Sequence, residues 1–240
     1  MATTGDRPRP DAAGGSAAGG RRVTLDDVRG DPEVQVFVRR ADENLGVLGY
    51  TEHGPRHCGL VADIAENVLL RLGYPRRTAE LAAIAGYLHD IGNGINRLDH
   101  GIAAALASQR LLERLGMPPE EYIEVMCAIG NHEEEYGEAV SPLAAAVILA
   151  DKSDVHRSRV REPDPDTEDI HDRVNMATTH SFLHVDGEAK AITLELEIDT
   201  SLIQVMQYFE IFLDRMVMCR RAAEFLGCRF GIVINGQRVL

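Results

Sequence analysis

Apolar residues recur every three to four positions from Val23 to about 154, and this spacing predicts a series of amphipathic helices. The first helical region contains Asp31-Pro32, the order of an N-cap residue followed by a first-turn proline. Five helices are expected further along, at 57–72, 78–88, 100–115, 119–131 and 142–154. Gly73 and Gly116 follow two of them as typical C-terminal stops, and Ser141-Pro142 is the cap of the last. The pattern therefore predicts a helical bundle.

Beyond Val160 the pattern changes from helical spacing to alternation. The segments 182–185 and 191–198 flank Asp186-Gly187, and 230–234 and 237–240 flank Asn235-Gly236; both dipeptides favour tight hairpin turns. A long amphipathic helix is expected between them, at 201–226, ending at Gly227. The expected fold is mainly α: a helical bundle with a small C-terminal α+β element made of two hairpins around one helix.

The distribution of residue types divides the chain into three parts. Residues 1–22 are rich in Gly, Ala, Pro and Arg without periodicity, so we expect a disordered tail. Residues 23–161 form the predicted helical domain. Residues 162–240 form the C-terminal element, which begins with an acidic, proline-containing linker at 162–168. The apolar helix 201–226 beside two hairpin edges leads us to expect a homodimer.

Charge and cysteine content limit the possible functions. With 25 basic and 38 acidic residues the formal net charge is −13, which opposes non-specific binding to nucleic acid or to an anionic membrane. The four cysteines show no paired spacing and are expected to be reduced thiols. No signal peptide or membrane span is visible in the sequence. We therefore expect a cytoplasmic protein.

Histidines and aspartates lie at the ends or on the inward faces of the predicted helices. The candidate metal ligands are His57, His89, Asp90, His100, His132 and Asp151. Imidazoles and carboxylates without thiolates point to a divalent transition metal, namely Mn, Fe, Zn, Co or Ni. One or two ions could be held; two ions sharing Asp90 would use all six ligands and would suit displacement at phosphorus.

This arrangement resembles the HD-domain superfamily of metal-dependent phosphohydrolases over roughly residues 50–160. The family pattern of a histidine, a His-Asp pair and a distant aspartate matches His57, His89-Asp90 and Asp151. The resemblance implies that these four hold one ion. It also implies that Asp90, His100 and His132 hold a second, as in the binuclear HD-GYP-type branch. The chain departs from that branch at Asn93, where a lysine is usual, at Asn131, where a second histidine is usual, and in lacking the Gly-Tyr-Pro signature.

Further roles are assigned by hypothesis. Asp90 and His132 are expected to take part in catalysis, as is Asp154, which could orient a ligand or a water molecule or could pair with Arg157 or Ser158. The basic run 152–161 suggests Lys152, Arg157 and Arg159 as contacts of a substrate phosphate. The alternative for the arginines is pairing with the acidic linker.

The sequence therefore predicts a hydrolase in which metal-activated water attacks a phosphate monoester or diester, with a nucleotide as the expected substrate. One alternative is a sensor that binds a nucleotide or metal in the same pocket without turnover. Another is a di-iron oxygenase, because some HD-type proteins use two irons and oxygen.

Overall fold

The computed structural model describes residues 22–161 and 170–240. The tail predicted at 1–22, apart from Arg22, and the linker predicted at 162–168 lie outside the described residues. The described helices are α1 (Leu25–Gly30), α2 (Pro32–Val47), α3 (Pro55–Arg71), α4 (Arg76–Leu88), α5 (His100–Leu115), α6 (Pro119–Gly130), α7 (Pro142–Ser153), α8 (Ile170–Ala177) and α9 (Val205–Phe225), with short 3-10 helices η1 (Ile91–Gly94) and η2 (Arg157–Arg159).

Local sequence signals place the starts of α2 and α7 where they were expected, whereas α3 and α4 begin two residues earlier than expected. The Asp31 side chain accepts hydrogen bonds from the backbone N–H groups of Glu33 and Val34 at the start of α2. The Ser141 hydroxyl accepts one from Ala144 at the start of α7. Each cap satisfies backbone donors that the first helical turn leaves without an intrahelical partner, so these two helices begin at defined residues.

Helices α3, α4 and α7 form the centre of the bundle. Every residue of α7 from Leu143 to Ala150 is buried, which explains why this helix has little amphipathic character. At the crossing of α3 and α4, a Cβ atom at Gly86 would lie 3.1 Å from the Cα of Ala62. A glycine at this position therefore lets the two backbones approach closely.

The C-terminal part forms one four-stranded sheet, made of β1 (Thr178–Asp186), β2 (Ala191–Ile198), β3 (Arg229–Ile234) and β4 (Gln237–Arg238) in that order. Strands β1 and β2 are antiparallel, as are β3 and β4, which confirms the two predicted hairpins within a mainly helical fold. The hairpins are also joined, because β2 pairs with β3 in parallel. Helix α9 makes the crossover between these two strands.

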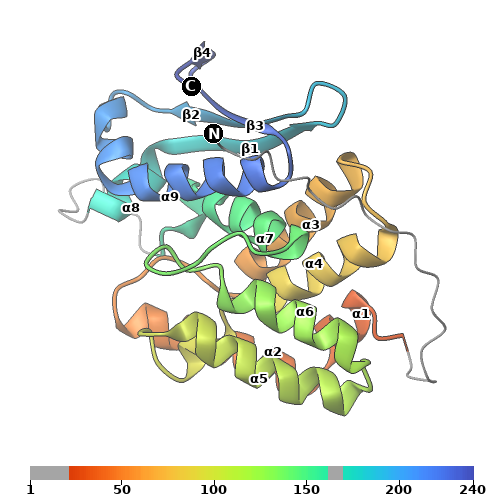
Figure 1. The fold of residues 1–240 in the computed structure, drawn as a ribbon. Coiled ribbons are helices and arrows are strands. Elements are labelled where there is room, and N and C mark those ends of the chain that lie inside the picture. The colour runs from red at the N-terminus through yellow and green to blue at the C-terminus, as the bar shows by residue number, and fades with distance from the viewer. Residues whose placement is uncertain (1–21, 162–169) are drawn as a thin grey trace, which may run out of the picture.

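Helix α9 lies between the sheet and the helical bundle, with α7 on its other side (Figure 1). The inward residues of β1, β2 and β3 pack with α9 and with the bundle in one continuous hydrophobic core. The C-terminal part is thus held against the helices that carry the candidate ligands. Within the described ranges, no helix has the length and apolar content needed to cross a membrane.

Candidate metal centre

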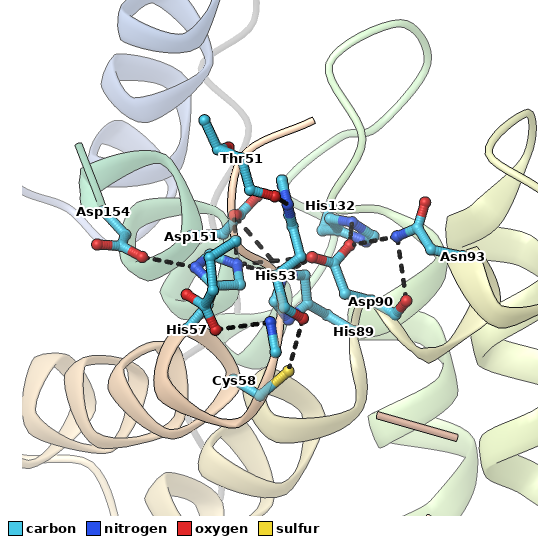
Figure 2. Close-up of polar contacts among 12 residues, drawn as sticks. Thr51, His53, His57, Cys58, His89, Asp90, Asn93, His132, Asp151 and Asp154 are labelled. Atoms are coloured by element: carbon cyan, nitrogen blue, oxygen red, sulfur yellow. Dashed lines mark hydrogen bonds and ion pairs between the residues drawn. The ribbon is translucent and has the colours of Figure 1, made fainter. Parts of the chain in front are cut away.

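Five helices deliver the candidate ligands at or near their ends. His57 lies in the first turn of α3, and His89 and Asp90 follow the last residue of α4. His100 is the first residue of α5. His132 follows α6, and Asp151 lies in the last turn of α7. The structure thus brings the predicted ligands together. Figure 2 shows five of them, His57, His89, Asp90, His132 and Asp151, and every ligand except the half-buried Asp151 is buried.

Four of these side chains form a first group around a common centre. His57 Nε2 lies 3.3 Å from His89 Nε2, 3.5 Å from Asp90 Oδ2 and 3.4 Å from Asp151 Oδ1. His89 Nε2 lies 3.3 Å from Asp90 Oδ2 and 3.6 Å from Asp151 Oδ1. Donor atoms about 2.1 Å from one ion are separated by about 3.0 to 3.4 Å, depending on the coordination geometry. His57, His89 and Asp151 therefore have the spacing of ligands to one ion, and Asp90 Oδ2 lies beside both histidines.

The other oxygen of Asp90 faces a second group. Asp90 Oδ1 lies 3.2 Å from His100 Nε2 and 3.8 Å from His132 Nε2, and these two nitrogens are 3.2 Å apart. Asp90 therefore stands between two sets of donors, with one carboxylate oxygen directed to each. This is the arrangement that a bridging ligand needs.

The hydrogen bonds of the imidazoles fix which nitrogen faces each group. Nδ1 of His89 lies 2.7 Å from the carbonyl oxygen of Gly86, and Nδ1 of His132 lies 2.7 Å from that of Ile129. A carbonyl oxygen only accepts, so each Nδ1 carries a proton and donates it. The Nε2 atoms of these rings then point into the centre, as metal ligation requires.

The residues present fit a divalent cation. Asp90 Oδ2 is buried and accepts no hydrogen bond from any described residue. A buried carboxylate oxygen without a donor is costly unless a cation compensates it. Burial disfavours the charge on Asp90, but His89 and His100 hold the pKa of its carboxyl group well below the usual range, so the oxygen is negative. A divalent cation between this buried anion and the imidazole nitrogens would compensate its charge.

Asp154 is not one of the donors of the first group, but it contacts one of them. Its Oδ2 accepts a hydrogen bond from His57 Nδ1 at 2.7 Å (Figure 2) and another from Arg56 Nη2 at 2.8 Å. Arg159 Nη1 donates to the backbone oxygen of Asp154. Of the two roles considered for Asp154, the geometry favours orienting a ligand; its partners are Arg56 and Arg159 rather than Arg157 or Ser158.

Glu133 supports the second group in a comparable way. Its Oε1 lies 3.2 Å from His100 Nδ1 and accepts hydrogen bonds from the Tyr136 hydroxyl and from the backbone N–H of Gly101. Burial opposes the charge of Glu133, but these contacts lower its pKa to about 2. A Cβ at residue 101 would lie 2.8 Å from the same oxygen, so Gly101 leaves room for this carboxylate.

A cavity opens onto the second group. It has a volume of about 100 Å³ and is lined by Asp90, His100, His132 and Asp151 together with cationic side chains: Arg97, Lys152, Arg159 and Arg215. A larger cavity of about 490 Å³ shares Arg97, Arg159 and Arg215 with it and adds the aromatic rings of Tyr50 and Phe212. Glu133, Glu134 and Glu135 line the smaller cavity too, so the candidate metal centre borders charges of both signs first and aromatic surface beyond them.

Two of the three predicted phosphate contacts lie at this cavity. Lys152 and Arg159 line it, and both are buried. Arg157 does not: it borders a separate hollow with Met176 and Leu202. The described partner of Arg161 is Asp42, so here too a basic side chain of this run pairs away from the metal centre.

Sequence reasoning missed several groups at the site. His53 lies in the turn before α3, where its Nδ1 donates to Thr51 and its ring contacts that of His57. Arg97 lies in the link before α5, with Nη1 3.2 Å from His100 Nε2. Arg215 comes from α9, outside the predicted helical domain. His53 was detectable because it lies four residues before His57, whereas nothing in the sequence connects Arg215 to the ligands.

A cluster of histidines and aspartates at converging helix ends could hold a metal ion in the core of a helical bundle. Residues 56–155 match the family model of the HD domain. This part of the chain is therefore similar to the HD domain, whose family consists generally of metal-dependent hydrolases that bind divalent metals. The matched range includes every ligand of both groups.

One curated relative extends beyond the HD domain. It is an uncharacterized protein of Methanocaldococcus jannaschii, MJ1020, which is 25% identical over 198 residues. The match covers 73% of this chain and 76% of the relative. Since the matched segment is longer than the HD domain, the similarity to this relative includes sequence outside the ligand-bearing helices.

Proposed function

We propose that this protein hydrolyses a phosphate monoester or diester of a nucleotide at a centre of two divalent metal ions. The observation that carries the proposal is the position of Asp90, whose two oxygens face separate donor groups. Bound ions would supply an activated water molecule and would neutralise charge on the phosphoryl oxygens. Mn, Fe, Zn, Co and Ni all suit the imidazole and carboxylate donors.

The residues of the chain bind and orient the substrate in this proposal. The first group, His57, His89, Asp90 and Asp151, would hold one ion; His100 and His132 would hold the other with Asp90. Lys152, Arg159, Arg97 and Arg215 supply positive charge for the phosphate at the cavity. Guanidinium groups match phosphate oxygens with paired hydrogen bonds, which favours a fixed orientation of the phosphoryl group.

Support for a nucleotide comes from the larger cavity. Its volume of about 490 Å³ is within the range of small-molecule sites. Tyr50 and Phe212 offer ring faces, and Thr51 and Asn175 offer polar groups. Arg97 stacks 5.2 Å from the ring centre of Tyr50, and Arg215 stacks 4.6 Å from that of Phe212. A ligand with an anionic end and a planar end would match both cavities at once.

The test is metal analysis followed by turnover. Protein purified without chelator is expected to hold up to two ions per chain and to cleave a member of a nucleotide and phosphoester panel, with Mn under nitrogen. Asp90→Ala should remove bound metal and turnover together. Asp63→Ala, which removes an exposed carboxylate paired with Arg29, should leave both unchanged. Full activity in Asp90→Ala, or turnover that requires oxygen, would contradict the proposal.

The homodimer also remains a proposal. It is supported by apolar side chains on the outer face of α9 and on the C-terminal residues beside it, with Leu213 55% exposed and Val239 50% exposed. Leu213→Glu is expected to convert dimers to monomers in light scattering. Glu210→Gln, an uncharged substitution on the same helix, should leave the mass unchanged.

A further inference from the structure

Glu134 holds together two cationic side chains beside the metal centre. Its Oε1 lies 3.1 Å from Lys152 Nζ and 2.7 Å from Arg215 Nε. Lys152 comes from α7 and Arg215 from α9, so one carboxylate oxygen joins the helical domain to the C-terminal part. Both cations line the cavity at the second donor group.

The point where these two cations meet is a position for an anion beside the first donor group. Lys152 also contacts Asp151, with Nζ 2.8 Å from Oδ2, and Asp151 is a ligand of the first group. Two cations converging on one oxygen form the contacts that a phosphate oxygen would make. The Glu134 carboxylate thus occupies the position that suits an oxygen of a bound phosphoryl group.

Glu134 is the group in this arrangement that can move. The side chains of Lys152 and Arg215 are 7% and 25% exposed, whereas that of Glu134 is 31% exposed. Its neighbour Glu133 is fixed by Gly101 and Tyr136. The backbone beside Glu134 is therefore anchored, while rotation of its own side chain would carry the carboxylate into solvent.

We propose that Glu134 is an internal occupant of a phosphate subsite formed by Lys152 and Arg215, and that an incoming phosphoryl group displaces it. The inference rests on the proposed function and adds a residue that regulates phosphate binding at that site. Glu134 pairs with the buried cation of Lys152 and the half-buried cation of Arg215 when no substrate is present. It also excludes anions that bind too weakly to compete with a carboxylate, so it sets the affinity for phosphate.

The test uses the metal-loaded full chain and inorganic phosphate, with binding measured by calorimetry. Glu134→Gln keeps the shape of the side chain and removes its charge. A hydrogen bond to a charged group contributes roughly 1.5–3 kcal/mol, so removing the competitor should tighten phosphate binding by about tenfold or more. Phosphate should also raise the melting temperature of this variant more than that of the parent chain.

Glu135→Gln is the matched control, because Glu135 lines the same cavity and the substitution removes the same charge. It should tighten phosphate binding much less than Glu134→Gln. Adding Arg215→Gln to Glu134→Gln should abolish the gain. Equal affinities in the Glu134 and Glu135 variants would overturn the subsite. Absence of phosphoester turnover in every variant, with the phosphate difference intact, would overturn the hydrolase proposal and leave the subsite standing.

Discussion

His57 and Asp154, 97 residues apart in the chain, are joined by a 2.7 Å hydrogen bond between Nδ1 and Oδ2 inside the molecule. The bond keeps the proton of His57 on Nδ1 and turns Nε2 toward the first donor group. Arg56, adjacent to His57, contacts the same carboxylate oxygen. The start of α3 and the end of α7 are thereby fixed to each other around one imidazole.

Replacing Asp154 should weaken metal binding without removing a ligand. Partners that orient a metal-bound histidine typically contribute about 10–100-fold to metal affinity or activity. We expect a loss of this size in Asp154→Ala and a smaller one in Asp154→Asn, which keeps an oxygen near His57. Metal titration by calorimetry measures it. Unchanged affinity in Asp154→Ala would show that His57 is oriented by other contacts.

Gly92 determines how closely η1 approaches α5. A Cβ at this position would overlap the carbonyl oxygen of His100 and approach the backbone nitrogen of Ala104. Backbone atoms cannot move aside as a flexible side chain can, so Gly92→Ala should lower the free energy of unfolding by about 3 kcal/mol. The substitution should also weaken binding at the second donor group, because the clash displaces His100.

Gly59 provides the control for that substitution. It lies within α3, and a Cβ there meets nothing within 4 Å. Gly59→Ala should raise the free energy of unfolding by about 0.5–1 kcal/mol, since alanine favours helix over glycine. Urea denaturation of both variants measures the difference. If Gly92→Ala proved as stable as the parent chain, the close contact between η1 and α5 would be incorrect.

Features set by local sequence were predictable. The caps at Asp31 and Ser141 and the helical spacing between them depend on neighbouring residues, and they placed the helix starts correctly. The ligands could be proposed because histidines and aspartates at helix ends are few. The resemblance to the ligand spacing of the HD-domain superfamily then indicated which of these residues to propose as ligands.

Features set by distant contacts were not predictable. The parallel pairing of β2 with β3 depends on how α9 crosses the sheet, which no turn signal specifies. Arg157 and Arg159 lie two residues apart in the short helix η2, and only Arg159 lines the cavity. The basic run has no periodicity that distinguishes them. Arg215 reaches the site from the C-terminal part, far from any ligand in sequence.

Metal binding should release a proton from His89. Burial by itself would lower the pKa of this imidazole, but the adjacent carboxylates of Asp90 and Asp151 raise it to about 10 in the ion-free protein. His89 is then protonated at neutral pH, and its contribution to stability is complete below about pH 6.5 and is lost as the pH rises toward 10. An ion at Nε2 replaces that proton.

The affinity of the first group for metal should therefore increase with pH, by about tenfold per unit for one released proton below pH 10. His132 adds no second proton, because burial and the charges on His89 and His100 lower its pKa to about 3. Calorimetry at pH 7.5 in buffers of different ionisation enthalpy measures the number of protons released when metal binds. Release of no proton, or an affinity independent of pH, would contradict this assignment.

Arg97 should limit occupation of the second donor group. Its Nη1 lies 3.0 Å from His100 Nδ1 and 3.2 Å from Nε2, so a positive charge already lies against the imidazole that the second ion needs. Two positive charges a few ångströms apart repel by roughly 1 to 4 kcal/mol, depending on exposure to water. Arg97→Met should therefore raise the affinity for the second ion by at least about fivefold. The first ion should bind as before.

The same substitution should weaken substrate binding, because Arg97 also lines both cavities. Arg97→Met is thus expected to hold two ions more readily and to show a higher KM for a phosphoester. Arg110→Met, which removes an exposed arginine of α5, should change neither. Stepwise metal titration and steady-state kinetics on the three proteins separate the effects. If Arg97→Met bound the second ion no better than the parent chain, the Arg97 side chain would move away from His100 without cost when the ion binds. Its role would then be confined to substrate binding.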